Sequence, residues 1–191
     1  MKVDRDRIMA AVRELILAIG ENPEREGLQF TPRRVAEMFE EIFSGVGVEV
    51  EPEIAIFTTE NQDEMILMRD IPFYSMCEHH LLPFWGTVAI AYIPNNNRIT
   101  GFSSLARVVE LMARRPQLQE RMTTDIAEML MRVLHPLGVF VVIKAQHLCT
   151  TMRGVKKAGA WSVTSSMRGA MRREATRLEA LMLMGEKGTL G

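Results

Sequence analysis

Thiol and imidazole side chains gather at two places in this sequence. Cys77, His79 and His80 lie within the stretch SMCEHHLLPF, and His147 and Cys149 are separated by one residue far downstream. Zinc in proteins is bound mainly by cysteine, histidine and carboxylates, and a catalytic site uses three such ligands and leaves a fourth position open. The pair Cys77-x-x-His80, joined by Cys149, is compatible with a catalytic metal site.

The same residues allow other interpretations. Cys77 and Cys149 could form a disulfide, although two cysteines are too few for a secreted disulfide scaffold. A thiol nucleophile with a histidine base is a second alternative, and its partners can be identified only in a fold. Buried, inert cysteines and hydrogen-bonded histidines are a third. If residues 147–149 are extended, His147 and Cys149 project to the same face, which would place a proton-transferring imidazole beside a metal ligand.

Composition narrows the class of protein. The chain has 191 residues, of which 47% are hydrophobic and 25% charged, with a formal net charge of −1. This balance indicates an ordinary globular protein, without the basic character that favours binding to nucleic acid or a membrane surface. No apolar run approaches the roughly 20 residues of a spanning helix, and the first residues carry acidic side chains and lack a cleavage signal. We expect a cytoplasmic protein.

The residues near the start of the chain predict a helical arm. Apolar residues recur at helical spacing from Ile8 to Ile19, and Gly20 ends that segment. A second helix is expected from Thr31-Pro32, where a capping residue precedes a proline, to the sequence SGVG. These helices predict an N-terminal arm over residues 1–60, with the boundary to the main domain near residue 60.

Residues 61–191 alternate between strand and helix patterns. Strands are expected first, then two helices, then strands again and a last helix, which predicts an α+β fold with mostly antiparallel pairing. The expected strands cover 64–76, 86–94, 138–146 and 160–166, and the helical stripes run over 105–112, 122–133 and 174–184.

Several long motifs occur together in this chain, and with them it resembles the GTP cyclohydrolase I family. They are TPRRVAEMFEEIFSG, SMCEHHLLPFWG, VAIAYIP, GFSSLARVVELMARRPQLQERMTTDIA, HLCTTMRGV and VTSSMRG. The resemblance implies a tunnelling fold and a homodecamer of two pentamers with active sites between subunits. It also implies conversion of GTP to 7,8-dihydroneopterin triphosphate and formate, the first step of tetrahydrofolate and pterin biosynthesis.

The resemblance also assigns the residues of the site. It implies that Cys77, His80 and Cys149 bind zinc, and that the catalytic side chains are those of His79, His147 and Ser103. In that reading the adjacent histidines divide the work, one holding metal and one facing substrate. Neighbours in an extended segment point to opposite sides, so such a division is physically reasonable. Glu78 has no role that chemistry alone assigns; a hydrogen bond to a ligand imidazole and a solvated carboxylate are both open.

Substrate recognition follows the same resemblance. Glu120 corresponds to the family's guanine-binding residue, and a carboxylate can accept hydrogen bonds from N1–H and the exocyclic amine of guanine together. Arg107 and Arg153 correspond to phosphate-binding positions, and Arg34 is a further candidate. The chain has no G-x-x-x-x-G-K-[ST] motif, which fits a protein that grips the triphosphate without cleaving it.

One position departs from the family pattern. The family commonly reads G-L-S-K where this chain has Gly101-Phe102-Ser103-Ser104. The missing lysine predicts looser binding of triphosphate, and it keeps open a noncatalytic paralogue that binds purine nucleotides or a partner protein. A further alternative is the nitrile reductase of deazapurine metabolism, which shares the fold but uses a cysteine nucleophile and a nicotinamide cofactor.

Overall fold

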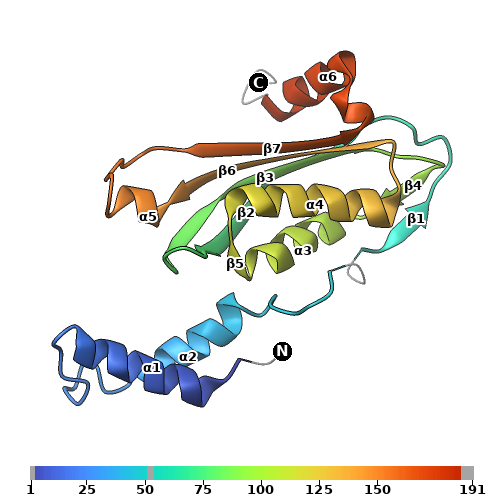
Figure 1. Ribbon diagram of the computed structural model, residues 1–191. Helices are drawn as coiled ribbons and strands as arrows, with labels where there is room; N and C mark the ends of the chain where they lie inside the picture. The colour runs from blue at the N-terminus through green and yellow to red at the C-terminus, as the bar shows by residue number, and fades with distance from the viewer. Residues whose placement is uncertain (1–2, 51–53, 186–191) are drawn as a thin grey trace, which may run out of the picture. The chain divides into compact units, whose positions relative to one another are not determined.

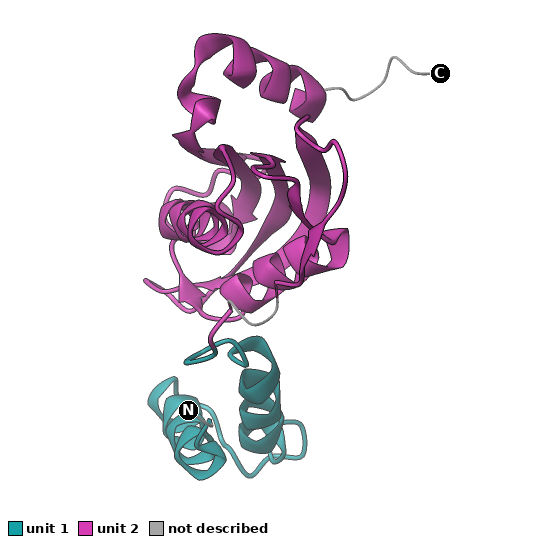
Figure 2. Ribbon diagram, turned by 90° about the vertical axis from the view of Figure 1, so that its right-hand side faces the viewer, with its two compact units in different colours: residues 1–48 teal, residues 49–191 magenta. Residues whose placement is uncertain are grey.

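The chain forms two compact units, Met1–Val48 and Glu49–Gly191, shown in different colours in Figure 2. The structure is a computed structural model that describes residues 3–50 and 54–185. The expected boundary near residue 60 lies beyond β1 (Ile56–Thr58), which pairs with β4 (Arg98–Thr100). This pairing places residues before position 60 in the second unit.

The first unit consists of two helices, as the sequence predicts. They are α1 (Arg5–Ala18) and α2 (Thr31–Ile42), which pack against each other. The Asp4 side chain caps α1 by accepting a hydrogen bond of 3.1 Å from the Arg7 amide. Pro32 lies in the first turn of α2, where its missing N–H costs nothing.

The second unit is built on a five-stranded sheet with the order β5-β2-β3-β6-β7. Every neighbouring pair is antiparallel except β2 and β5. Figure 1 shows α3 and α4 on one face of the sheet and α6 on the other. The predicted α+β fold is therefore confirmed. The elements are β2 (Ile66–Cys77), β3 (Pro83–Ile93), α3 (Phe102–Ala113), β5 (Pro116–Gln117), α4 (Gln119–Leu134), β6 (Gly138–His147), β7 (Ser162–Gly169) and α6 (Glu174–Gly185).

Short elements escape prediction because they hold too few residues to show a periodic pattern. They are β1, β4, β5, the helix α5 (Leu148–Thr151) and the 3-10 helix Ala170–Arg172. Of these, β5 and α5 matter most for the site, because β5 pairs with the end of β2 at Cys77 and α5 begins directly after His147.

The main core lies between the sheet and helices α3 and α4. Apolar side chains from both layers are fully buried there, and each contributes about 1.5–3 kcal/mol relative to an exposed position. They include Phe84 and Tyr92 of β3, Leu105 and Val108 of α3, and Met122, Ile126 and Leu130 of α4. This packing holds the two helices rigidly against the strands that carry the candidate ligands.

Antiparallel pairing brings the candidate metal ligands and His147 to one end of the sheet. The end of β2, the start of β3 and the end of β6 are adjacent, with His147 paired to Phe84. β5 pairs with the last residues of β2, so α4 begins at the same end. β3 and β6 approach so closely here that a Cβ on Gly86 would lie 1.8 Å from the Lys144 carbonyl oxygen. No helix in residues 3–50 or 54–185 is long and apolar enough to cross a membrane.

Candidate active site

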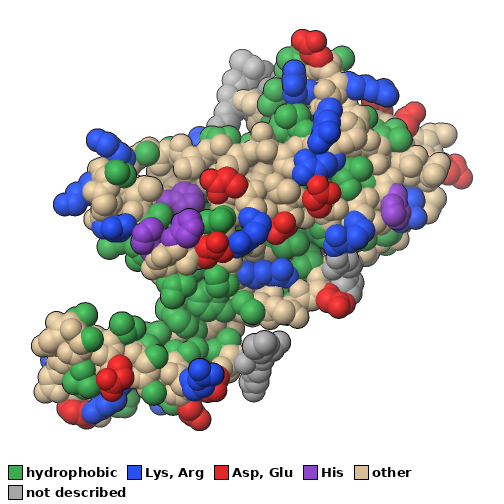
Figure 3. Space-filling view, in the orientation of Figure 1, with side chains coloured by type: hydrophobic (Ala, Val, Ile, Leu, Met, Phe, Trp, Pro, Cys, Tyr) green, Lys and Arg blue, Asp and Glu red, His purple; other side chains and the backbone are tan. Residues whose placement is uncertain are grey.

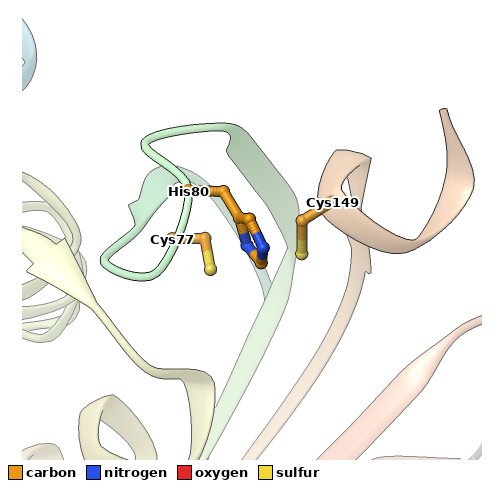
Figure 4. Close-up of side chains that lie close together, drawn as sticks. All are labelled: Cys77, His80 and Cys149. Carbon is orange, nitrogen blue, oxygen red and sulfur yellow. The ribbon is translucent and has the colours of Figure 1, made fainter. Parts of the chain in front are cut away.

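Cys77, His80 and Cys149 form one cluster at this end of the sheet. Their ligand atoms all lie within 4.8 Å of one another. Figure 4 shows the two sulfur atoms on either side of the His80 imidazole. Two thiols and an imidazole are a donor set that suits zinc, and three protein ligands leave a position for water or substrate. Both cysteines are free thiols, so the disulfide interpretation is not supported.

A tight turn folds His80 back over Cys77. The Cys77 carbonyl accepts hydrogen bonds from the amides of His80 (3.4 Å) and Leu81 (2.8 Å). Leu81 has a φ of 50°, in the left-handed region that closes such turns. The expectation that His79 and His80 lie on an extended segment is therefore wrong, since β2 ends at Cys77. The two imidazole rings nevertheless diverge, with centroids 6.2 Å apart and planes at 88°.

Cys149 enters the cluster from a helix, not from a strand. β6 ends at His147 and α5 begins at Leu148, so the expectation of an extended 147–149 segment is also wrong. The Thr150 hydroxyl donates a hydrogen bond of 2.9 Å to the His147 carbonyl, which stabilises the turn. The pairing of β7 with β6 ends at Ala145, two residues before this turn.

The thiols are arranged for metal binding rather than for nucleophilic attack. Burial and the neighbouring Cys77 raise the pKa of Cys149, while Arg153 acts in the opposite direction. A nucleophilic cysteine needs a lowered pKa. Two adjacent thiols can ionise together where a bound cation offsets their charge, which favours the metal interpretation.

His147 is held rigidly beside the cluster. Its ring stacks on Phe84 at 4.6 Å, with the two planes 2° apart. Its Nε2 atom lies 2.7 Å from Oε1 of Gln119. Burial lowers the pKa of His147, whereas the Glu120 carboxylate raises it. The exposed Glu120 therefore lies close enough to His147 to influence its charge.

An ion pair connects the ligand turn to α4. Glu78 pairs with Arg121, whose guanidinium also donates a hydrogen bond of 3.2 Å to the Pro116 carbonyl. Arg121 lowers the pKa of Glu78. Glu78 is thus neither a partner of a ligand imidazole nor a free carboxylate, and it ties the turn after β2 to the start of α4.

Arg153 is also brought to the cluster. Its Nη1 atom lies 3.1 Å from Nε2 of His80. Figure 3 shows histidine side chains gathered at one end of the larger unit, with lysine and arginine side chains beside them. A cation next to the cluster can meet an anionic substrate.

Ser103 lies at the start of α3, at the other end of the sheet from the cluster, and Arg107 follows it on the same helix. They lie on α3, which follows β4, and the Thr100 amide before it donates a hydrogen bond of 3.1 Å to the Tyr92 hydroxyl. Tyr92 is near the end of β3 farthest from Phe84 and His147. Arg34 lies on α2 in the other unit.

Ser104 does not occupy an open position. It is 6% exposed, and its hydroxyl accepts a hydrogen bond of 3.3 Å from the Ala55 amide. A lysine at this position would displace the hydroxyl that the Ala55 amide uses as its acceptor. The looser binding of triphosphate expected from the missing lysine stays a prediction.

Sequence analysis missed the residues that surround the cluster without belonging to it. They are Phe84 and Gln119, which hold His147, and Arg121, which binds Glu78. The signals that could have drawn attention to them are the adjacency of Gln119 and Arg121 to Glu120 and the place of Phe84 in the stretch SMCEHHLLPF.

We predict that Cys149→Ser strongly reduces the zinc content of purified protein, from about one ion per chain, because serine replaces a thiolate ligand. Elemental analysis of protein dialysed against zinc-free buffer measures this. Thr150→Ser, a neighbour in α5 that keeps the hydroxyl bonded to His147, should retain full zinc. Full zinc in Cys149→Ser would remove Cys149 from the ligand set.

We predict that Ser104→Lys lowers stability by about 1–3 kcal/mol, because it leaves the Ala55 amide without its acceptor and forces a long side chain into filled space. Urea unfolding measures the change, with Ser104→Ala as the control that loses the hydroxyl alone. A Ser104→Lys variant that keeps full stability and binds GTP more tightly would restore a phosphate-binding role for this position.

Comparison with known proteins identifies the family. The family model for GTP cyclohydrolase I matches residues 8–185. The GTP cyclohydrolase 1 of Thermoanaerobacter pseudethanolicus is 54% identical over 186 residues, covering 97% of this chain and 99% of that protein. The GTP cyclohydrolase 1 of Pelotomaculum thermopropionicum is 56% identical over 182 residues, covering 95% of this chain and 97% of its own length.

A solved structure, the archaeosine synthase QueF-Like in the apo form, aligns with 59% of this chain and 98% of its own, at 17% identity and a TM-score of 0.45. A likeness of this extent says nothing about function. The family match, in contrast, spans both units and includes every residue of the Cys77–His80–Cys149 cluster. The chain therefore belongs to the GTP cyclohydrolase I family.

Proposed function

We propose that this chain converts GTP to 7,8-dihydroneopterin triphosphate and formate, using a zinc ion held by Cys77, His80 and Cys149. The observation that carries the proposal is the convergence of these three ligands beside His147, in a member of the GTP cyclohydrolase I family. The reaction is the first step of tetrahydrofolate and pterin biosynthesis. A cytoplasmic location suits it, because free thiols persist in a reducing compartment.

The chemistry requires water to open the imidazole ring of guanine at C8. A bound zinc ion supplies Lewis-acid activation of water for this step. The protein's part is to fix the donor atoms: Cys77 on the last residue of β2, His80 on the turn, and Cys149 on α5. Three ligands leave one side of the site open toward the substrate.

His147 is suited to move a proton at the guanine ring. An imidazole can donate a proton to the ring nitrogen as the bond between that nitrogen and C8 breaks. Phe84 and Gln119 already hold the His147 ring in one orientation, so little reorganisation is needed. His79 is exposed on the turn outside the cluster, and we assign it, together with Ser103, to opening of the ribose.

Glu120 is suited to select guanine over adenine. Its carboxylate can accept hydrogen bonds from N1–H and the exocyclic amine of guanine, whereas adenine offers no adjacent pair of donors in the same arrangement. Glu120 is exposed in the first turn of α4, and its effect on the pKa of His147 indicates that it faces the same site. The guanine ring would then lie between the two side chains.

The triphosphate needs cations that one chain does not gather in one place. Arg153 lies at the cluster, but Ser103 lies at the start of α3, near the far end of β3, and Arg107 follows it on the same helix. We therefore infer that a neighbouring subunit supplies Ser103 and Arg107, within a homodecamer of two pentamers. β7 lies at the edge of the sheet, with a paired strand on one side only, and it offers a backbone edge to such a neighbour. Arg34 remains a further candidate for phosphate contact.

The proposed activity has a direct test. Purified protein incubated with GTP should release formate and form a fluorescent pterin after oxidation. His147→Ala should keep its zinc and its fold and lose activity by about 10²- to 10⁴-fold, the usual contribution of general acid catalysis. A wild-type protein that binds GTP without forming formate or pterin would favour a noncatalytic nucleotide-binding paralogue instead.

Base selection has a separate test. Glu120→Gln replaces one acceptor oxygen with a donor aimed at the guanine amine, so GTP binding should weaken and discrimination against ATP should fall, by roughly 10-fold or more for a lost charge-assisted contact. Competition binding with GTP and ATP measures both effects. Glu128→Gln, farther along α4 and paired with Arg168, is the matched control. Unchanged affinity and selectivity in Glu120→Gln would show that other groups read the base.

A further inference from the structure

Gln119 is a buried polar residue at the edge of the site that the proposed mechanism does not yet use. It is the first residue of α4 and is 2% exposed. Its side-chain nitrogen, which has two N–H donors, lies within hydrogen-bond distance of three acceptors: the Ile143 carbonyl at 3.0 Å, the Ser162 carbonyl at 3.2 Å and the Thr164 hydroxyl at 3.1 Å. These partners belong to β6 and β7, so the amide bridges α4 to both strands.

The partners fix which way the amide points. Ile143 and Ser162 offer carbonyl oxygens, which only accept hydrogen bonds, so the NH₂ group of Gln119 must face them. The Oε1 atom must then face His147, whose Nε2 lies 2.7 Å away. The oxygen and nitrogen of a side-chain amide are nearly identical in shape, so it is the hydrogen-bond partners that assign these two positions in Gln119.

The orientation of Gln119 in turn fixes the state of His147. Oε1 can only accept a hydrogen bond, so Nε2 of His147 must carry a proton and donate it. The ring stacks on Phe84, and in this position Nε2, not Nδ1, is the nitrogen that lies against Oε1. In the neutral imidazole, Nδ1 is then the nitrogen with a free lone pair, and it is the one left to meet a partner in the site.

We propose that Gln119 is a positioning residue that holds His147 in the tautomer with its proton on Nε2 and directs Nδ1 toward the substrate. This inference rests on the proposed function for the role of His147 in proton transfer. When the bond between the ring nitrogen and C8 breaks, its electron pair stays on the nitrogen, which takes the proton from Nδ1 of the imidazolium. The neutral His147 that remains is the tautomer that Gln119 stabilises.

The first test is Gln119→Met, which keeps the length of the side chain but removes both the acceptor and the donors. We expect kcat for formate release to fall about 10-fold or more, a part of what general acid catalysis contributes. The KM for GTP should stay within about twofold and the zinc content should be unchanged, because the Gln119 amide is occupied by protein partners and is not one of the three ligands.

Thr123→Val is the matched control. The Thr123 hydroxyl bonds to the Gln119 carbonyl and to the Thr164 hydroxyl, both at 2.6 Å, so it belongs to the same buried network without touching His147. Its kcat should stay within about twofold of wild type if the effect of Gln119 acts through His147. Equal losses of kcat in both variants would reduce Gln119 to a structural role and overturn the proposal.

The second test does not depend on activity. Solid-state nitrogen NMR of zinc-loaded, ¹⁵N-histidine-labelled protein distinguishes the two tautomers, and His147→Ala identifies the His147 signals. Wild type should carry the proton on Nε2, and Gln119→Met should lose this preference. A wild-type His147 with its proton on Nδ1 overturns the inference about Gln119. Absence of formate release in wild type would instead overturn the proposed function, and the NMR result would still decide the tautomer.

Discussion

The position of β3 between β2 and β6 is the constraint on which the site depends. Its register pairs Ser75 with Phe84 on one side and Phe84 with His147 on the other. The strand end that carries Cys77 and the strand end that carries His147 therefore meet across a single residue of β3. A slip of one residue would turn the His147 ring to the opposite face of the sheet. The packing of Phe84, which is fully buried, opposes such a slip and also provides the surface on which His147 stacks.

The start of α4 contributes three neighbouring residues to this end of the sheet. Successive residues of a helix point about 100° apart, so three neighbours can serve three directions. Gln119 points into the sheet and holds His147, Glu120 is exposed beside the same imidazole, and Arg121 reaches the turn through Glu78. Because buried Gln119 bonds to both β6 and β7, the helix cannot shift without breaking contacts to the strands. The ligand turn, the imidazole and the Glu120 carboxylate, which we propose to bind guanine, are thus tied to one rigid element.

The sequence predicts the long elements of this arrangement, because only an element of several turns or several strand residues shows a periodic pattern of apolar residues. The long helices and strands follow from periodicity, and the cluster follows from Cys77-x-x-His80 once the family motifs are taken into account. The change from strand to helix after His147 does not follow from the sequence, because a helix of four residues leaves no periodic pattern to detect. The pairing of Glu78 with Arg121 joins side chains that are distant in sequence, and no local pattern predicts such a contact. The burial of Ser104 depends on the segment around Ala55, which only the fold brings to α3.

The topology also separates the metal-binding cluster from the start of α3, which carries candidate catalytic and substrate-binding residues. β3 has 11 residues, and at about 3.3 Å for each residue its ends lie roughly 30 Å or more apart. Ser103 and Arg107 follow the end near Tyr92, whereas the cluster and His147 lie at the end near Phe84. This separation supports the proposal that Ser103, at the start of α3, serves a nucleotide bound at the cluster of a neighbouring chain. In the proposed assembly, metal binding is therefore a property of the individual chain, since all three ligands belong to it, while catalysis is a property of the interface between chains.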